Sequence, residues 1–92
     1  MTNFVWLNKQ GVQGESGFVV QFTGRFSAEY REAGRIVHVD VEDGGQSGDK
    51  GHLLYSRSSL LRFASTESER KRIDTNFREA IIFQGLIPIA YD

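Results

Sequence analysis

Residues 66–91 predict a long helix followed directly by a short strand, and this order constrains the fold more than any other segment. Thr66 and Glu69 have the spacing of a capping box, which satisfies free amide groups at a helix start. Apolar residues at helical spacing then predict one buried stripe, made of Ile73, Phe77, Ala80 and Ile81. Gly85 can turn left-handed and end the helix. The alternation of residues 86–91 is typical of a strand.

The preceding residues predict strands with short connections. The predicted strands cover residues 4–8, 17–23, 27–31, 35–42 and 52–56. Residues 9–16 are expected to be a loose connection, and a short helix is expected at 58–63 with Ser58 or Ser59 as its cap. Four of the nine residues in 43–51 are glycine and none is apolar, so this segment is predicted to be the most flexible loop.

Strands first, helices later and one last strand are typical of an α+β domain. We expect one domain, residues 1–92, with a twisted, mainly antiparallel sheet of about five to six strands. The long helix, preceded by the short one, is expected to pack on one face of the sheet. A final short strand follows the long helix in the chain. The stripe of the long helix would cover Val37, Val39 and Val41, which alternate along one strand.

Composition excludes several classes of function. The chain has no cysteine, which rules out disulfides and thiolate metal sites and favours the reducing cytoplasm. No apolar run reaches the roughly 20 residues of a membrane span, and residues 1–11 lack the pattern of a signal peptide. Eleven basic and twelve acidic residues argue against general nucleic-acid binding.

Three polar residues, His38, Asp40 and Glu42, alternate with those valines and would form a row on the opposite face. An imidazole with two carboxylates could bind a divalent metal or serve acid–base chemistry. A solvated sheet face explains the same alternation together with the valines, so we expect no metal or cofactor. A third interpretation is an acidic partner-binding strip, extended by Asp43 and Asp49.

Other motifs have simpler explanations. The glycine-rich segment lacks a P-loop, and no GxSxG motif is present. The basic triplet Arg70–Arg72 is expected to be a solvated helix face, neutralised by Glu67, Glu69 and Asp74. Most of Phe4, Trp6, Phe26 and Tyr30 are expected in the core. One exposed aromatic beside carboxylates would be a natural interface anchor.

The segments LLYSRSSLLRF (53–63) and ERKRIDTNFREAIIFQGLIPI (69–89) resemble the C-terminal half of immunity protein family 74 of bacterial polymorphic toxin systems. Residues 16–43 match that family more loosely. The matching positions are Tyr55, Ser59, Leu60, Arg62, Arg72, Ile73, Asn76, Ala80, Phe83, Gln84 and Gly85.

The resemblance implies a cytoplasmic immunity protein, of the kind encoded beside contact-dependent growth inhibition toxins. Such a protein binds and neutralises a cognate toxin domain, in some systems a nuclease, and needs no catalysis, cofactor or small-molecule substrate of its own. The expected contact residues are His38, Asp40, Glu42, Asp43 and Asp49. The alternative is a small protein-binding or regulatory module with another protein partner.

Overall fold

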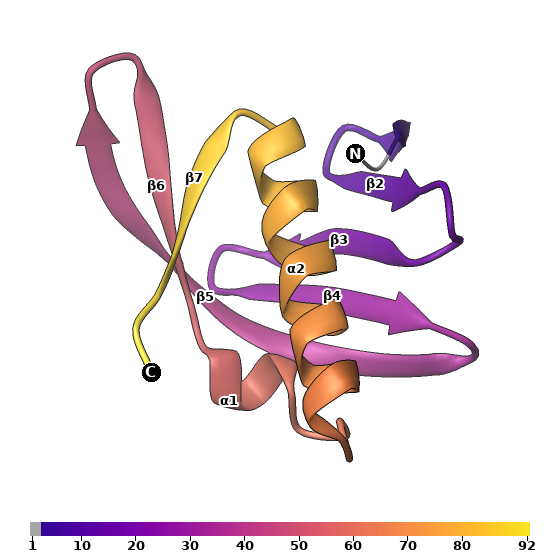
Figure 1. The fold of residues 1–92 in the computed structure, drawn as a ribbon. Coiled ribbons are helices and arrows are strands. Elements are labelled where there is room, and N and C mark those ends of the chain that lie inside the picture. The colour runs from indigo at the N-terminus through magenta and orange to yellow at the C-terminus, as the bar shows by residue number, and fades with distance from the viewer. Residues whose placement is uncertain (1–2) are drawn as a thin grey trace.

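Seven strands form one curled sheet, and a long helix lies across its concave side (Figure 1). The structure is a computed structural model that describes residues 3–92, with only the backbone of Ser47. The strands are β1 (Phe4–Asn8), β2 (Gly11–Gly14), β3 (Val19–Gly24), β4 (Ser27–Glu32), β5 (Arg35–Ser47), β6 (Lys50–Tyr55) and β7 (Leu86–Ala90). The helices are α1 (Arg57–Leu60) and α2 (Glu67–Phe83).

The strands lie in the sheet in the order of the chain, from β1 to β7. Each strand from β1 to β6 pairs antiparallel with the next, whereas β7 pairs parallel with β6. A parallel neighbour needs a crossover, and the segment containing α1 and α2 provides it. The predicted α+β class with a mainly antiparallel sheet is confirmed, but the sheet has seven strands instead of five or six.

The strand that sequence reasoning missed is β2, because two of its four residues are glycine. These glycines allow close contact with neighbouring side chains. A Cβ atom on Gly11 would lie 2.1 Å from the Gln21 side chain, and one on Gly14 would lie 2.4 Å from the Phe18 ring. Glycine in a strand often marks such a close approach. Residues 9–16 are therefore a tight hairpin and strand, and the expected loose connection is wrong.

The longest strand, β5, changes partners halfway along its length. Its first half, up to Asp40, pairs with β4, and its second half, from Val41, pairs with β6. The sheet bends at this change of partner, so the β5–β6 hairpin projects from the body of the protein (Figure 1). Most of the loop predicted at 43–51 lies in this hairpin, with an irregular register between Asp43 and Gln46. The prediction of a loop there is wrong.

The helix α2 begins and ends where the sequence predicts. The Oγ of Thr66 accepts a hydrogen bond from the N–H of Glu69 (3.1 Å), and Gly85 has a φ of 89° just after the helix. All four residues of the predicted stripe are buried: Ile73, Phe77, Ala80 and Ile81. They join Val37, Val39 and Val41 in one core, so the predicted packing of helix on sheet is confirmed.

The short helix α1 starts earlier than expected. Its cap is Ser56, whose side chain accepts a hydrogen bond from the N–H of Ser59 at 3.1 Å. The Asp92 carboxylate accepts a second one from the N–H of Arg57 (2.6 Å). Ser56 has the extended backbone that an N-cap residue needs, whereas Ser58 and Ser59 lie inside the helix. The expected caps Ser58 and Ser59 are therefore wrong.

No helix among residues 3–92 has the length and apolar character needed to cross a bilayer.

Candidate protein-binding surface

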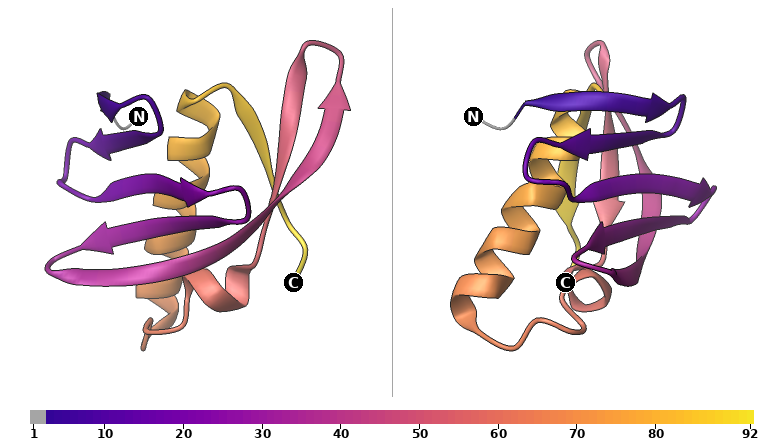
Figure 2. Two further views of the ribbon diagram at one scale, coloured as in Figure 1. Left: turned by 180° about the vertical axis from the view of Figure 1, so that it is seen from behind. Right: turned by 90° about the vertical axis from the view of Figure 1, so that its right-hand side faces the viewer.

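The predicted polar row lies on the outer face of the sheet, opposite to α2. His38, Asp40 and Glu42 are exposed, whereas the valines that alternate with them are buried against the helix. Figure 2 (left) views the sheet from this outer side. Because alternate residues of a strand point to opposite faces, one strand presents all three polar side chains together. The interpretation as a solvated face therefore agrees with the fold.

The backbone of Asp40 is fixed where β5 changes partners. Its N–H donates to the hydroxyl of Ser59 (3.0 Å), and its carbonyl accepts from the N–H of Ser56 (2.9 Å). Ser59 also donates to the carbonyl of Ser56 at 2.9 Å. The start of α1 thus holds the strand at Asp40, so the carboxylates of Asp40 and the nearby Glu42 have a defined backbone position.

The register adds Glu29 of β4, which sequence reasoning missed. Glu29 lies opposite His38, and Ser27 lies opposite Asp40. We call Glu29, His38, Asp40 and Glu42 the acidic strip. Arg31 approaches Glu29 at 3.9 Å, a distance at which two partly exposed charges attract each other weakly. The alternation of β4, with Ala28 and Tyr30 inward, was the signal that could have placed Glu29 on this face.

The other two predicted contact residues lie apart from the strip. Asp43 accepts a hydrogen bond from the N–H of Gly45 (2.8 Å) and lines an open notch of about 450 Å³. Arg25 and Leu86 lie on the same notch. Asp49 is exposed in the turn between β5 and β6. The structure therefore brings together three of the five predicted residues, and leaves Asp43 and Asp49 along the projecting hairpin.

The turn between β3 and β4 carries an exposed aromatic side chain, and its backbone contacts β5 at Val41. Phe26, in the turn between β3 and β4, is 60% exposed, and its carbonyl accepts a hydrogen bond from the N–H of Val41 (3.1 Å). The guanidinium of Arg25 lies 5.9 Å from the centre of its ring. Trp6 is also half exposed, so the expectation that most of these aromatics are in the core is wrong for both residues. The aromatic interface anchor stays a prediction, and Phe26 is an exposed candidate for it.

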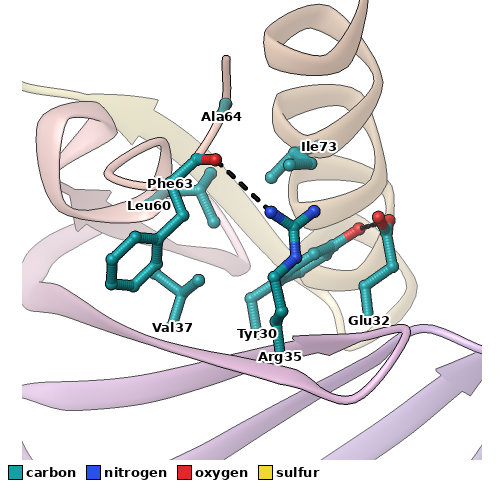
Figure 3. A pocket seen from close by; sticks show the side chains of 8 residues that line it. All are labelled: Tyr30, Glu32, Arg35, Val37, Leu60, Phe63, Ala64 and Ile73. Atoms are coloured by element: carbon teal, nitrogen blue, oxygen red, sulfur yellow. Dashed lines mark hydrogen bonds between the residues drawn. The ribbon is translucent and has the colours of Figure 1, made fainter.

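An apolar cavity beneath α1 and α2 holds only about 10 Å³ (Figure 3). Tyr30, Val37 and Ile73 contribute to its wall, and Arg35 reaches across its mouth to the carbonyl of Phe63 (3.4 Å). This volume is about that of one water molecule. Small-molecule sites typically measure roughly 300–1,000 Å³, so this cavity is a packing defect.

Tyr30 is a buried tyrosine that joins the first half of the sheet to α2. Its hydroxyl donates to Glu32 (2.7 Å) and accepts from the side chain of Asn76 (3.1 Å), while Arg72 pairs with Glu32. Burial raises the pKa of Tyr30 well above its ordinary value, so the hydroxyl keeps its proton near neutral pH. Arg72 and Asn76, two positions of the family resemblance, therefore have structural partners here.

One residue of the basic triplet of α2, Arg72, pairs with a residue of the sheet and not with one of the helix. Arg72 pairs with Glu32, whereas Arg70 and Lys71 are exposed. Glu69 lies 3.8 Å from Arg35, and Asp74 lies 3.3 Å from Arg57. The expected neutralisation within the helix is therefore wrong in its partners, because the β4–β5 hairpin and α1 bring Glu32, Arg35 and Arg57 beside α2.

Metal ligation requires several donor side chains close together. Within residues 3–92, no three or more histidine, aspartate or glutamate side chains gather in a way that could hold a metal ion. His38, Asp40 and Glu42 follow one another at every second residue of a strand, which separates neighbouring members by roughly 6.6 Å along the chain. The absence of specific metal binding stays a prediction for titration.

Comparison with known proteins adds no identification. No family model, no curated protein and no solved structure matched this chain. The functional assignment therefore depends on the surface described above and on the resemblance of residues 53–89 to the immunity proteins.

Proposed function

We propose that this protein is a cytoplasmic immunity protein that binds a cognate toxin domain and blocks its activity. The observation that carries the proposal is the acidic strip, whose carboxylates lie on the face of the sheet opposite to α2. Its central residue, Asp40, is held by the backbone contacts to Ser56 and Ser59. A binding surface needs such fixed charges, since charges that are already in place cost less to order on binding.

The charge of the strip indicates the kind of toxin surface it would meet. A row of carboxylates complements a basic patch, and enzymes that cleave nucleic acids have basic clefts because their substrates carry phosphates. An immunity protein with this surface would cover such a cleft or bind beside it. Phe26 would add an apolar anchor at the margin of the charged contact. Neutralisation then requires binding alone, and the protein is proposed not to be an enzyme.

Co-purification with the toxin domain encoded beside this protein is the direct test. The two proteins should form a stable complex, and expression of this protein should protect cells from the toxin. Asp40→Lys combined with Glu42→Lys should weaken both complex formation and protection. A matched variant, Arg70→Glu combined with Lys71→Glu on the exposed face of α2, should keep both.

Two results would contradict the proposal. Binding to a different protein with no protection against the toxin would favour the regulatory module instead. Complex formation that survives the strip variant and is lost in the α2 variant would move the interface to the helix.

A further inference from the structure

The two edges of the sheet differ in how well they are protected from pairing with another strand. This difference is independent of the proposed function. β1 forms one edge of the sheet (Figure 2, right), and the strand order places β7 at the other. An edge strand exposes backbone groups that can pair with another strand. Proteins commonly protect such edges with proline or charged residues. Within residues 3–92, β7 contains a proline, whereas β1 contains neither proline nor a charged residue.

The edge at β7 is blocked by proline. The N–H of Tyr91 donates to the carbonyl of Tyr55 (3.1 Å), so odd-numbered residues of this segment point their backbone groups toward β6. Even-numbered residues point toward the open side. Pro88, the only proline in the sequence, occupies the middle of that side and has no N–H to donate.

Among the residues that the structure describes, no strand pairs with the outer edge of β1. The N–H of Gly14 donates to the carbonyl of Phe18 in the hairpin with β3 (2.9 Å), so the backbone groups of Gly14 point away from β1. Phe4 lies opposite Gly14 and therefore points its own N–H and C=O toward the outer edge. Trp6, two residues further along β1, does the same. The register becomes irregular after Trp6, so residues 3–6 are the part of this edge suited to regular pairing.

Apolar side chains surround this open edge on both faces. Val5 and Leu7 are exposed on one face, at 60% and 48%. On the other face Trp6 is 52% exposed, and its ring centre lies 5.7 Å from that of Phe83 at the end of α2. We call Val5, Trp6, Leu7 and Phe83 the β1 edge patch. β1 contains no charged residue. Exposed apolar side chains on both faces of a strand, beside unpaired backbone groups, are typical of an interaction site.

We infer that β1 pairs antiparallel with β1 of a second copy of this chain, with Val5 on the two-fold axis. Phe4 of each copy then lies opposite Trp6 of the other, and their outward N–H and C=O groups satisfy one another. The same patch serves both sides, as a two-fold interface requires. The two sheets become one continuous sheet, and the aromatic side chains of the two β1 edge patches meet on one face.

The charges at the ends of β1 favour the antiparallel arrangement. Lys9 follows the strand at one end, and at the other end Glu15 accepts a hydrogen bond from the side chain of Asn3 (3.1 Å). Antiparallel pairing brings the Lys9 end of one copy toward the Glu15 end of the other, twice per dimer. Opposite charges at both ends stabilise the pair and fix its direction.

The size of this contact sets its expected strength. One short strand and its flanking side chains bury less than the roughly 1,200–2,000 Å² of a stable protein interface. The dimer should therefore be weak and dependent on concentration, with a dissociation constant in the micromolar range. Sedimentation equilibrium over a series of concentrations should show a mass that rises from monomer to dimer.

Charge variants at the axis test the arrangement. Val5→Lys places two like charges directly opposite each other, and Val5→Glu does the same with the other sign, so each variant alone should be monomeric. An equal mixture of the two variants should recover the dimer. Ile89→Lys on the β7 edge is the matched control and should dimerise like the unmodified protein. Circular dichroism and thermal melts check that the exposed substitutions leave the fold intact.

The inference is overturned by a monomeric protein at the highest soluble concentration, by dimerisation that both Val5 variants retain, or by a mixture that stays monomeric. Loss of the dimer in Ile89→Lys alone would place the contact at the other edge. None of these outcomes depends on whether a toxin is bound.

Discussion

The hydroxyl of Tyr55 donates a 2.6 Å hydrogen bond to Asp74, which joins the second half of the sheet to the helix that covers it. Arg78 donates to the same hydroxyl at 3.2 Å, and Arg57 donates to Asp74 at 3.3 Å. The Tyr55 ring lies 4.9 Å from that of Phe77, centre to centre. This one side chain therefore combines apolar packing with a charged hydrogen-bond network between β6 and α2.

Tyr55→Phe should lower the free energy of unfolding by about 1–3 kcal/mol, because it removes a hydrogen bond to a charged group and leaves the packing in place. Urea unfolding measures the loss. Tyr91→Phe, at a half-exposed tyrosine, is the matched control and should change stability by less than about 0.5 kcal/mol. Equal effects of the two substitutions would mean that the contact to Asp74 contributes nothing.

Alkaline pH should destabilise the fold. Burial, reinforced at Tyr55 by the hydrogen bond to Asp74, raises the pKa values of Tyr30 and Tyr55 above their ordinary value of 10.0. Below that value both the folded and the unfolded chain keep these protons, so stability is unaffected. Above it the unfolded chain loses them first, so the free energy of unfolding should fall as pH rises beyond about 10. Urea unfolding from about pH 8 to about pH 11 should show this decline.

The control for that experiment is the variant Tyr30→Phe, Tyr55→Phe, which lacks both titrating groups. Its stability should be lower at neutral pH but should fall less steeply in alkaline solution. An equally steep decline in this variant would assign the alkaline loss to other groups.

Phe77→Ala should destabilise the protein by about 3–5 kcal/mol, because Phe77 is fully buried and the neighbouring core cannot collapse into the space of a lost ring. Ile82→Ala, on the exposed side of the same helix, should cost much less and controls for helix propensity. Thermal melts compare the two variants. If Phe77→Ala melts like the unmodified protein, the packing of α2 described above is incorrect.

Zinc and manganese should bind no tighter than micromolar at His38, Asp40 and Glu42. Their spacing along a strand suits contact with solvent better than joint coordination of one ion. Coordination needs every donor atom within roughly 2.0–2.3 Å of the metal. Isothermal titration calorimetry is the measurement. Tight binding that disappears in Asp40→Ala would contradict this prediction and the non-enzymatic function with it.

Reversing Asp40 and Glu42 to lysine should slow association with the toxin domain by about tenfold or more at low salt, since the strip would then repel a basic surface. Salt should weaken binding of the unmodified protein and affect the variant less. Stopped-flow mixing at several salt concentrations measures both effects. Asp43→Lys is a useful comparison, because this residue faces the notch beside Arg25 and should matter less.

Sequence patterns predicted α2, β7 and the inward face of β5, because the apolar period and the end signals agree at those elements. They missed β2, because its two glycines interrupt the alternation of apolar and polar residues. In the structure, glycine is needed there because the side chains of Gln21 and Phe18 pack directly against the β2 backbone. They also predicted a loop for residues 43–47, the last part of β5. The pairing of these residues with β6 depends on backbone hydrogen bonds, which composition does not record. The acidic strip was predicted in part, and Glu29 joins it only through the register of β4 with β5.

The parallel pairing of β6 with β7 also determines the order in which the protein can fold. The strands from β1 to β6 connect through short turns, so their contacts can form soon after each strand is made. About 30 residues separate β6 from β7 in the chain, and contacts that close such a long loop form slowly. The β6 edge therefore stays unpaired until β7 has been made. Until then β6 exposes Leu53 and Tyr55 along an unpaired edge. A ribosome-bound chain that stops before Leu86 is therefore the species most exposed to mispairing with other chains.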